Sequence, residues 1–413
     1  MTTEAGRPAA PPRRLLFLAP FPPRRDATHG GSRAIAELVH ALAGRHRVGL
    51  LYLTAADDPP VDPLLEQRCD LIVGAKRPSP AGRSGRLRHQ ARLAAALLRG
   101  QPLWVSGWGS PELLAVVRRV ARDWRPDLVQ LEYHLMGRYL PALHGVPAPR
   151  VLRQLEPGTA SSLDREAQRR GAARLASRLD RWAWARYERR LMREVQAVVA
   201  LTERDEAALR QLAPDAPIVR IPLDVPVPAQ ALNPSGHGRP SVLFVGSYSH
   251  PPNADAAERL VRGIFPPVRR ELPEAALSIV GADPPAGLGQ RGGEGVEVTG
   301  RVPDVTPYLD AAAVFAAPLR LGGGMRVKVL EALAAGKAVV ASPRAVDGLS
   351  VANGKQVVLA ETDEEFATAI VELLREPQRR LELARRAREW ATANLGQERT
   401  TLAFEHLYDT LLR

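Results

Sequence analysis

Short apolar runs of strand length alternate with helical segments along this chain, and the alternation occurs twice. The first series of runs is Leu15–Ala19, Val48–Leu53, Leu71–Val73, Leu128–Glu132, Val151–Arg153 and Ala197–Leu201, with helical patterns such as Ser32–Gly44 and Glu112–Trp124 between them. The second series is Val242–Val245, Leu277–Val280, Val296–Thr299, Val314–Ala317, Ala338–Ala341 and Val357–Leu359. Buried strands separated by helices are typical of parallel sheets with helical crossovers.

A proline-rich stretch separates the two series. Residues 222–240 contain five prolines, which is typical of a linker. A chain of 413 residues is also too long for one ordinary core. We therefore predict an α/β fold of two Rossmann-like domains whose parallel sheets face a central cleft. The expected parts are a first domain at 1–225, a linker at 226–240, a second domain at 241–395 and a final helix at 396–413. Ligands of such sheets bind at the carboxyl ends of the strands, so we expect the functional site in the cleft.

Cysteine usage and the first apolar run indicate where the protein works. Cys69 is the only cysteine, which excludes an intramolecular disulfide, and no Cys and His pattern has metal-ligand spacing. The run Leu15–Pro20 is too short for a signal-peptide core or a membrane span. We expect a cytoplasmic protein without a bound metal.

The excess of basic residues lies in the first half. Of the net charge of +12, residues 1–235 contribute +13, from 36 Lys and Arg against 23 Asp and Glu. Residues 83–99 form a basic amphipathic pattern, and Arg165–Arg193 contains ten arginines. Such helices can lie on an anionic membrane surface, and a solvated, ion-paired helix face is the alternative. Nucleic acid is not expected as a partner, because no recognition motif or aromatic platform accompanies the charge.

The segment Pro318–Lys337 carries the strongest chemical signal. Its glycines Gly322, Gly323 and Gly324 join a strand to a helix, where backbone amides and the helix dipole favour a phosphate group. Arg326 and Lys328 place positive charge in the first helical turn, which is unfavourable unless an anion is bound there. Glu331, further along the same helix end, can accept two sugar hydroxyls, and Gly336 is expected to end the helix. A simple tight connection is the alternative interpretation of the glycines.

Each series has another glycine-containing turn after its first strand. Gly246 and Ser247 are candidates to bind a ligand at the carboxyl end of a strand. The next helix is expected to start at Asn253, for which helix capping is an explanation as good as catalysis. In the first half, Gly30 and Gly31 open a helix that would face the same cleft.

Together these motifs resemble the family 4 glycosyltransferases of the GT-B fold, which are retaining enzymes that use nucleotide-activated sugars. The resemblance covers nearly the whole chain. It is closest to a bacterial branch whose second domain opens with G-[ST]-x-x-x-x-P-N-x-D-A, here Gly246–Ala256, and whose donor loop reads G-G-G-x-R-x-K-x-L-E-A, here Gly322–Ala332. The stretch Val298–Val302 also resembles the family, in which it lies beside the nucleotide base.

The resemblance implies a role for each of these segments. Glu331 would hold the ribose, while the loop amides up to Met325, with Arg326 and Lys328, would hold the diphosphate and sugar and act in catalysis. Residues 1–225 would form the acceptor side, with Gly30 and Gly31 in its loop, and the final helix would return to that domain. Donor contacts are also expected from Gly246, Ser247, Gly300, Arg301 and Val302. The nucleotide-sugar is a substrate, so no cofactor is expected, and fixed cations would replace a metal.

The sequence departs from the family pattern at two positions. Many members have a glutamate eight residues before the ribose-binding one, where this chain has Gly323. Members commonly have a histidine after the strand matching Val151–Arg153, where this chain reads Gln154-Leu155-Glu156. Glu156, His134 and His29 are the candidate substitutes. A nucleotide-sugar epimerase and a non-catalytic glycan-binding or partner-binding protein of the same fold therefore remain alternatives.

Overall fold

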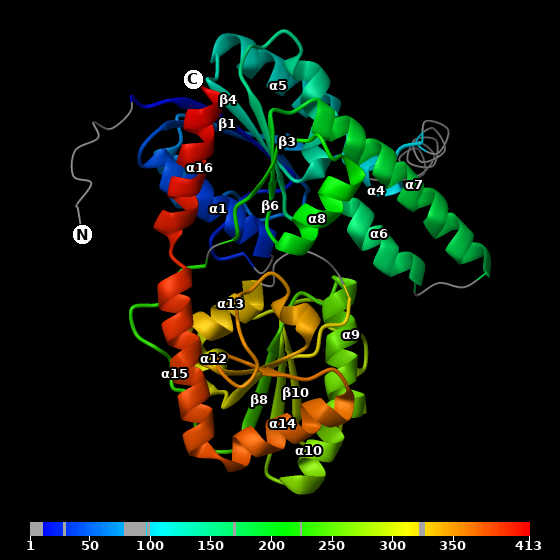
Figure 1. Cartoon of the computed structure of the whole chain (residues 1–413), viewed down its shortest axis with the longest axis vertical. Coiled ribbons are helices and arrows are strands. Elements are labelled where there is room, and N and C mark those ends of the chain that lie inside the picture. The colour runs from blue at the N-terminus through cyan, green and yellow to red at the C-terminus, as the bar shows by residue number, and fades with distance from the viewer. Residues whose placement is uncertain are drawn as a thin grey trace.

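The chain folds into two α/β lobes stacked along its long axis (Figure 1). The computed structural model describes residues 11–27, 30–77, 96, 100–167, 171–223, 225–321 and 327–413. Both lobes are built on parallel sheets, as the alternating apolar runs predict. The predicted fold class is therefore confirmed.

The first sheet has, within the described residues, the order β3-β2-β1-β4-β5-β6-β7, and all its strands are parallel. Its strands are β1 Arg14–Ala19, β2 Arg47–Thr54, β3 Leu71–Lys76, β4 Leu128–Glu132, β5 Arg150–Gln154, β6 Ala197–Ala200 and β7 Ile218–Arg220. The order reverses between β1 and β4, so the carboxyl ends of these two strands flank the crevice in which such sheets place ligands. The short edge strand β7 was not predicted, because only its first residue is buried and the apolar signal is weak.

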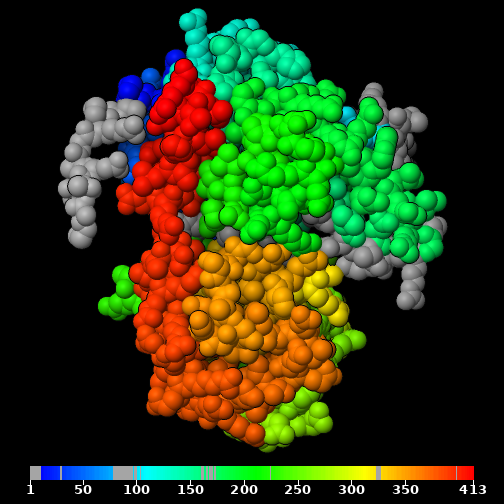
Figure 2. Space-filling view, viewed as in Figure 1, coloured from blue at the N-terminus to red at the C-terminus, as the bar shows by residue number. Residues whose placement is uncertain are grey.

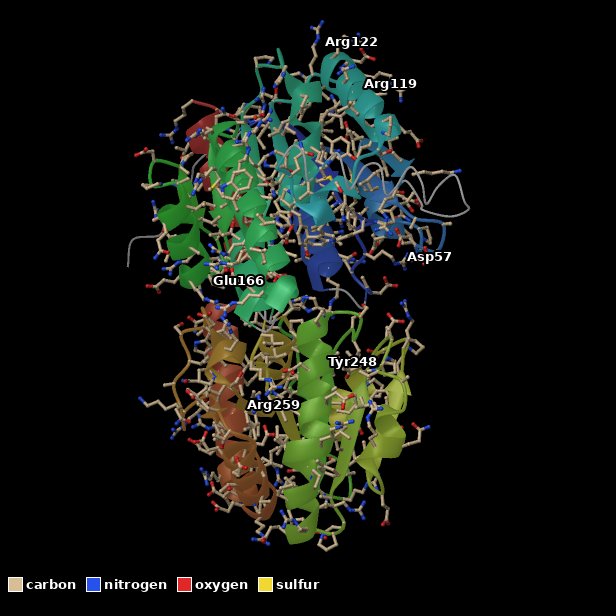
Figure 3. The ribbon with its side chains drawn as sticks, turned by 90° about the vertical axis from the view of Figure 1, so that its right-hand side faces the viewer. Asp57, Arg119, Arg122, Glu166, Tyr248 and Arg259 are labelled. Carbon is tan, nitrogen blue, oxygen red and sulfur yellow. The ribbon has the colours of Figure 1, made fainter. Side chains whose placement is uncertain are left out.

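Helices cover both faces of this sheet. They are α1 Gly30–Ala43, α2 Pro63–Arg68, α4 Leu103–Ser106, α5 Pro111–Asp123, the 3₁₀ segment η1 His134–Leu143, α6 Gly158–Ala167, α7 Gly171–Arg193 and α8 Glu203–Leu212. The apolar face of α5 buries Leu113 and Val117, while Arg119 and Arg122 point outward (Figure 3). The basic residues of α5 are thus a solvated helix face.

The second sheet has the order β10-β9-β8-β11-β12-β13 in the described residues, again all parallel. Its strands are β8 Ser241–Val245, β9 Ala276–Val280, β10 Val296–Gly300, β11 Val314–Ala317, β12 Ala338–Ala341 and β13 Val358–Leu359. Its helices are α9 Pro251–Arg259, the π segment η2 Leu260–Ile264, α10 Phe265–Glu271, α11 Leu288–Gly292, α12 Thr306–Ala311, α13 Val327–Ala334, the 3₁₀ segment η3 Pro343–Val346, α14 Asp363–Arg375 and α15 Pro377–Asn394. The last helix of the chain is α16 Gln397–Leu411. Gly336, with φ +74°, follows α13 as predicted.

Helix α9 starts earlier than the sequence suggests. His250 is the N-cap residue and Pro251 the first helical residue, so the expected helix start at Asn253 is wrong. Proline is favoured in the first turn because its missing N–H is not needed there. Near the end of α9, Arg259 binds the Pro318 and Glu361 carbonyls and the Asp363 carboxylate, which fixes the helix to the loops around α14 (Figure 3).

The last two helices run along both lobes. Helix α15 lies against the second sheet's lobe and α16 against the first (Figures 1 and 2). On α16, Glu405 pairs with Arg45 (2.9 Å) and Asp409 with Arg13 (2.6 Å), and the Tyr408 hydroxyl donates to Gln130 on β4. The chain therefore crosses between the lobes twice, once at 221–240 and once at α16.

Candidate functional site

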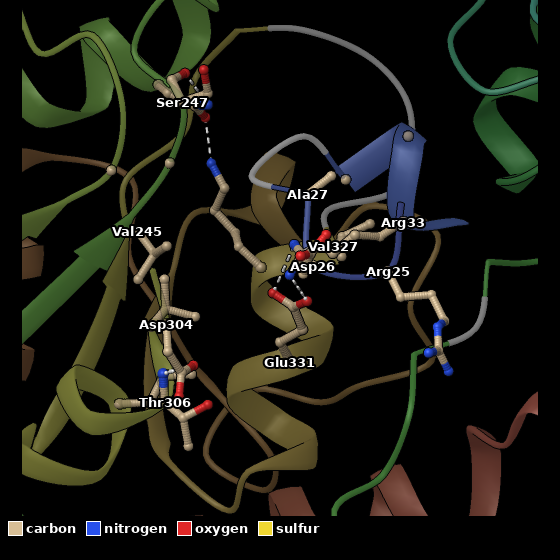
Figure 4. A pocket seen from close by; sticks show the side chains of 18 of the residues that line it. Arg25, Asp26, Ala27, Arg33, Val245, Ser247, Asp304, Thr306, Val327 and Glu331 are labelled. Carbon is tan, nitrogen blue, oxygen red and sulfur yellow. Dashed lines mark hydrogen bonds and ion pairs between the residues drawn. The ribbon is translucent and has the colours of Figure 1, made fainter. Parts of the chain in front are cut away.

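A cleft of about 870 Å³ lies between the lobes, at the carboxyl ends of both sheets (Figure 4). Among its lining residues from the first lobe are Arg25, Gly30, Gly31, Arg33, Tyr133 and Glu156. Those from the second lobe include Gly246, Ser247, Asn253, Val302, Lys328 and Glu331. The size is in the range of pockets that hold a ligand such as a dinucleotide or a nucleotide-sugar.

Glu331 is held in the cleft by helix α13. Its neighbours Val329, Leu330, Ala332 and Leu333 are buried against the second sheet, which turns Glu331 to the opposite side of the helix. Its carboxylate meets the Arg33 guanidinium of α1, with Nη1–Oε1 at 2.6 Å and Nη2–Oε2 at 3.2 Å (Figure 4). Burial raises the pKa of Glu331, and the positive charges of Arg33 and Lys328 oppose that rise.

Lys328 lies one turn before Glu331 on the same helix. Its ammonium group donates to the Asn253 side-chain oxygen and lies 4.9 Å from the centre of the Phe244 ring. Asn253 in turn donates through Nδ2 to the Ser247 carbonyl (2.7 Å). Asn253 is therefore the link between Lys328 and the turn after β8, a role that its expected place at a helix cap did not reveal.

The turn after β8 is packed against the next strand of the sheet. The Gly246 N–H donates to the Val280 carbonyl (3.0 Å), and a Cβ on Gly281 would overlap the Gly246 carbonyl. Gly281 lines the cleft, has φ +137° and was not predicted, although it directly follows an apolar run, as Gly246 does. Glycine at 281 lets the turns after β8 and β9 approach closely, and a Cβ on Gly246 would lie only 3.0 Å from Asn253 Cγ.

The segment after β10 contributes different residues from those expected. Val302 lines the cleft, whereas Gly300 and Arg301 are not among the lining residues. Gly300 accepts from the Gly281 N–H (3.0 Å), and Arg301 is exposed. Asp304 and Thr306 line the cleft instead, joined by a 2.9 Å bond from the Thr306 N–H to Asp304 Oδ1 (Figure 4).

The three candidate substitutes on the acceptor side have different positions. Glu156 lines the cleft, just beyond β5. His134 is buried against Trp184, with ring centroids 4.6 Å apart, and its Nδ1 lies 3.1 Å from Gln154 Oε1. His29 lies outside the described residues, as do Gly322, Gly323, Gly324, Met325 and Arg326 of the glycine loop.

Sequence reasoning missed Arg33, although a signal was present. Arg33 stands in the first turn of α1, where a cation is disfavoured by the helix dipole, and the same argument had singled out Lys328. The helix entry at Gly30 and Gly31 lies directly against α13, because a Cβ on Gly30 would lie only 3.2 Å from Val327 Cγ2. The two glycine-led helix starts therefore meet in the cleft.

The described ranges contain no group of three or more His, Cys, Asp or Glu that could hold a metal ion. In the same part of the chain, no helix has both the length and the apolar character that a membrane span requires. The cleft thus offers a carboxylate suited to a vicinal diol, beside a lysine at a helix N-terminus suited to a phosphate.

Two family models match the two lobes. The model described as glycosyl transferase 4-like domain matches residues 29–224, and that for glycosyl transferases group 1 matches residues 239–376. The second match includes Lys328 and Glu331. No curated protein sequence matches the chain significantly.

Solved structures share the whole two-lobed architecture. Sucrose-phosphate synthase from Thermosynechococcus elongatus aligns with a TM-score of 0.72 at 18% identity, over 97% of this chain and 99% of that chain. HepE from Anabaena, solved with UDP and glucose, aligns with a TM-score of 0.67 at 17% identity, over 96% and 100%. WaaG, a glycosyltransferase involved in lipopolysaccharide biosynthesis, aligns with a TM-score of 0.66 at 16% identity, over 96% and 99%. At these identities the likeness shows the shared GT-B fold.

Proposed function

We infer that this chain, a glycosyltransferase with a 4-like first domain and a group 1 second domain, transfers a sugar from a nucleotide-sugar donor to an acceptor with retention of anomeric configuration. The observation that carries the proposal is the pairing of Glu331 and Lys328 on one helix end in the interlobe cleft. Both residues lie in the segment matched by the group 1 glycosyltransferase model. The cleft also has walls from both lobes, as a two-substrate reaction requires.

The donor would bind mainly to the second lobe. The Glu331 carboxylate would accept the two ribose hydroxyls, and Lys328, at the N-terminus of α13, would neutralise the diphosphate. As the bond from the sugar to the diphosphate oxygen breaks, negative charge grows on that oxygen. Fixed positive groups aimed at this charge lower the barrier, which is why we propose transfer without a required metal.

The acceptor would enter from the first lobe. Glu156 and Tyr133 line that side of the cleft. Retention requires the acceptor oxygen to form its bond on the same face of the sugar that the diphosphate leaves. Proximity of donor and acceptor in one closed cleft supports that geometry.

A thermal-shift screen against UDP, GDP, ADP and their sugars tests donor binding, because a ligand that binds only the folded state raises the melting temperature. HepE was solved with UDP-glucose, so uridine nucleotides are the first to try. We expect one nucleotide series to stabilise the protein and Glu331→Ala and Lys328→Ala to abolish the shift. Unchanged binding in both variants would refute the donor site.

Product analysis separates transfer from the two alternatives. With donor alone, a transferase leaves the sugar configuration unchanged, whereas an epimerase converts it without an acceptor. A non-catalytic binding protein would produce neither product. Transfer that persists in excess EDTA would support metal independence, and loss of transfer that added Mg²⁺ restores would refute it.

We further propose that the protein works peripherally at the cytoplasmic face of a membrane. Helix α7 extends beyond the first sheet (Figure 1) and exposes Leu175, Leu179 and Trp182 at one-turn spacing, each by more than half of its surface. Arg186 continues this face and lies over the Trp182 ring. An apolar stripe that leads into arginines suits insertion beside anionic headgroups. By contrast, Arg178 and Arg181 pair with Glu166 and add less charge (Figure 3).

Liposome flotation tests this surface. We expect salt-sensitive binding to vesicles of phosphatidylcholine with phosphatidylglycerol, and loss of binding in Leu179→Ser with Trp182→Ser. The matched control is Leu402→Ser, which removes a leucine of α16 that is 49% exposed, against 59% for Leu179. Binding that is absent, or equally weakened by the control, would refute the membrane surface.

A further inference from the structure

The ion pair between Arg33 and Glu331 joins the two lobes across the cleft. The residues lie 298 positions apart in sequence, on α1 and α13. Each side chain is about three-quarters buried, and both carboxylate oxygens are contacted, at 2.6 and 3.2 Å. A second ion pair between the lobes in the described residues, from Arg204 on α8 to Asp347 after η3, is longer at 3.5 Å and more exposed. Arg33–Glu331 is therefore the tighter of these two interlobe contacts.

The geometry of the pair conflicts with the role proposed for Glu331. A guanidinium that approaches a carboxylate end-on uses the outward edge of both oxygens. A vicinal diol such as that of ribose would need the same edge, because each of its hydroxyls must donate a hydrogen bond to one carboxylate oxygen. The starts of α1 and α13 are in close contact beside this pair, because a Cβ on Gly30 would lie 3.2 Å from Val327 Cγ2. Ribose and Arg33 thus require the same atoms.

The way Arg33 contacts Glu331 allows a ligand to replace it at the carboxylate. Only its two terminal nitrogens bind Glu331, and within the described residues its Nε has no hydrogen-bond partner. Leaving a buried carboxylate without a close cation is costly, and Arg33 is the cation that contacts both oxygens of Glu331. When a ligand supplies hydroxyl donors, that partner is no longer required.

We propose that Arg33 is an interlobe latch that competes with the ribose of the donor for Glu331. Donor binding displaces Arg33 from the carboxylate and so couples nucleotide recognition on the second lobe to the position of α1 on the first. Arg33 acts through Glu331 and is therefore a positioning residue. The proposal rests on the proposed donor site, in which Glu331 binds ribose.

Calorimetric titration of Arg33→Gln at pH 8 tests the latch. The probes are UDP, GDP and ADP, each compared with its 2′,3′-dideoxy form. Removing the competing Arg33 side chain should raise the affinity for the nucleotide that binds by roughly three- to tenfold, the range expected for a partly buried ion pair. The dideoxy form, which cannot bind the carboxylate, should bind wild type and Arg33→Gln equally.

Three further variants complete the design. Arg33→Lys keeps the charge without the fork, so we expect a smaller gain than in Arg33→Gln. Arg45→Gln removes an arginine that follows α1 and pairs with Glu405 on α16, and it should not change the affinity. Glu331→Gln should weaken the binding of the unmodified nucleotide. In the Glu331→Gln background, adding Arg33→Gln should not change the affinity further.

The outcomes separate the latch from the donor site. Unchanged or weaker binding in Arg33→Gln, while Glu331→Gln still loses affinity, would overturn the latch and keep the donor site. An equal gain for the dideoxy form would likewise overturn it, because the gain would then not come from ribose. If none of the three nucleotides binds any variant, the donor site fails and the latch fails with it.

Discussion

Polar groups near the carboxyl ends of the two sheets differ in their exposure to the cleft. In the second lobe, Lys328 and Glu331 open into the cleft and are available to a ligand. In the first lobe, Glu156 beyond β5 lines the cleft, whereas the polar residues of β4 are sealed inside. Gln130 and Glu132 of β4 are fully buried, and Gln130 donates to Glu132 (2.7 Å), which faces Arg153. The helix that follows β11 thus presents polar groups to the cleft, whereas the polar groups of β4, the corresponding strand of the first sheet, brace the interior.

A second sealed cluster explains how the first lobe holds α6 and α7. Glu188 of α7 is buried and accepts from the Gly158 and Thr159 N–H groups, at 2.8 and 3.1 Å, and from Gln154 of β5. It therefore satisfies the free N–H groups at the start of α6. The comparison teaches that a polar residue at a strand end does not by itself mark a ligand site.

The largest effect is expected from Glu188→Ala. The substitution leaves buried donors at the start of α6 without an acceptor, so we expect a loss of about 3–5 kcal/mol in the free energy of unfolding. Urea denaturation measures it. Glu194→Ala at the end of the same helix removes a surface pair with Arg190 and should cost less than about 1 kcal/mol. Similar losses of unfolding free energy in the two variants would contradict a bracing role for Glu188.

Lys328→Met, in the cleft, should lower the transfer rate strongly and the stability little. We expect the transfer rate to fall by roughly a hundred- to a thousandfold, the range for a group that stabilises transition-state charge. Stability should change little, because the lysine lies at the cleft and the methionine stem can still cover Phe244. Steady-state kinetics and thermal melting together measure the effect, with the exposed Lys355→Met as control. A large loss of stability with normal transfer would place Lys328 among the bracing residues.

Asp205, on the first lobe near the cleft, predicts a pH effect of intermediate size. Burial, together with the charges of Asp347 and Glu156, raises the pKa of its carboxyl to about 6 from 3.8. Because the folded state binds the proton more tightly, the stability contributed by this group is greatest below pH 3.8 and is lost as pH rises toward 6. Asp205→Asn should therefore match wild type near pH 4 and exceed its stability by roughly 2 kcal/mol at pH 7.5.

Urea midpoints measured from pH 4 to 7.5 test this prediction. Asp180→Asn on α7, which is less buried than Asp205, serves as the control. A difference between wild type and Asp205→Asn that does not grow with pH would contradict the proposed environment of Asp205.

Much of the fold could be predicted from the sequence, because buried parallel strands are continuous apolar runs and their helices have a clear period. The cleft positions of Lys328 and Glu331 were predictable for a similar reason, since a charge at a glycine-led helix start is a local pattern. Arg33 opposite Glu331 and the sealing of His134 beneath Trp184 were not, because they depend on how distant segments pack. Local signals identify what a residue can do, and packing decides what it faces.

The smallest effect is expected from Arg320→Gln on the open side of the second lobe. Arg320 makes a two-pronged ion pair with Asp255, at 2.7 and 2.8 Å, but its side chain is 59% exposed. Solvent and the entropy of holding a long side chain offset most of the attraction, so we expect a loss below about 1 kcal/mol. Salt at 1 M should reduce the difference further, because it screens exposed charges over about 3 Å. Urea denaturation at low and high salt measures both. A salt-insensitive loss above about 2 kcal/mol would mean that this pair braces the lobe as the buried clusters do, and the contrast between the two strand edges would then hold only inside the cleft.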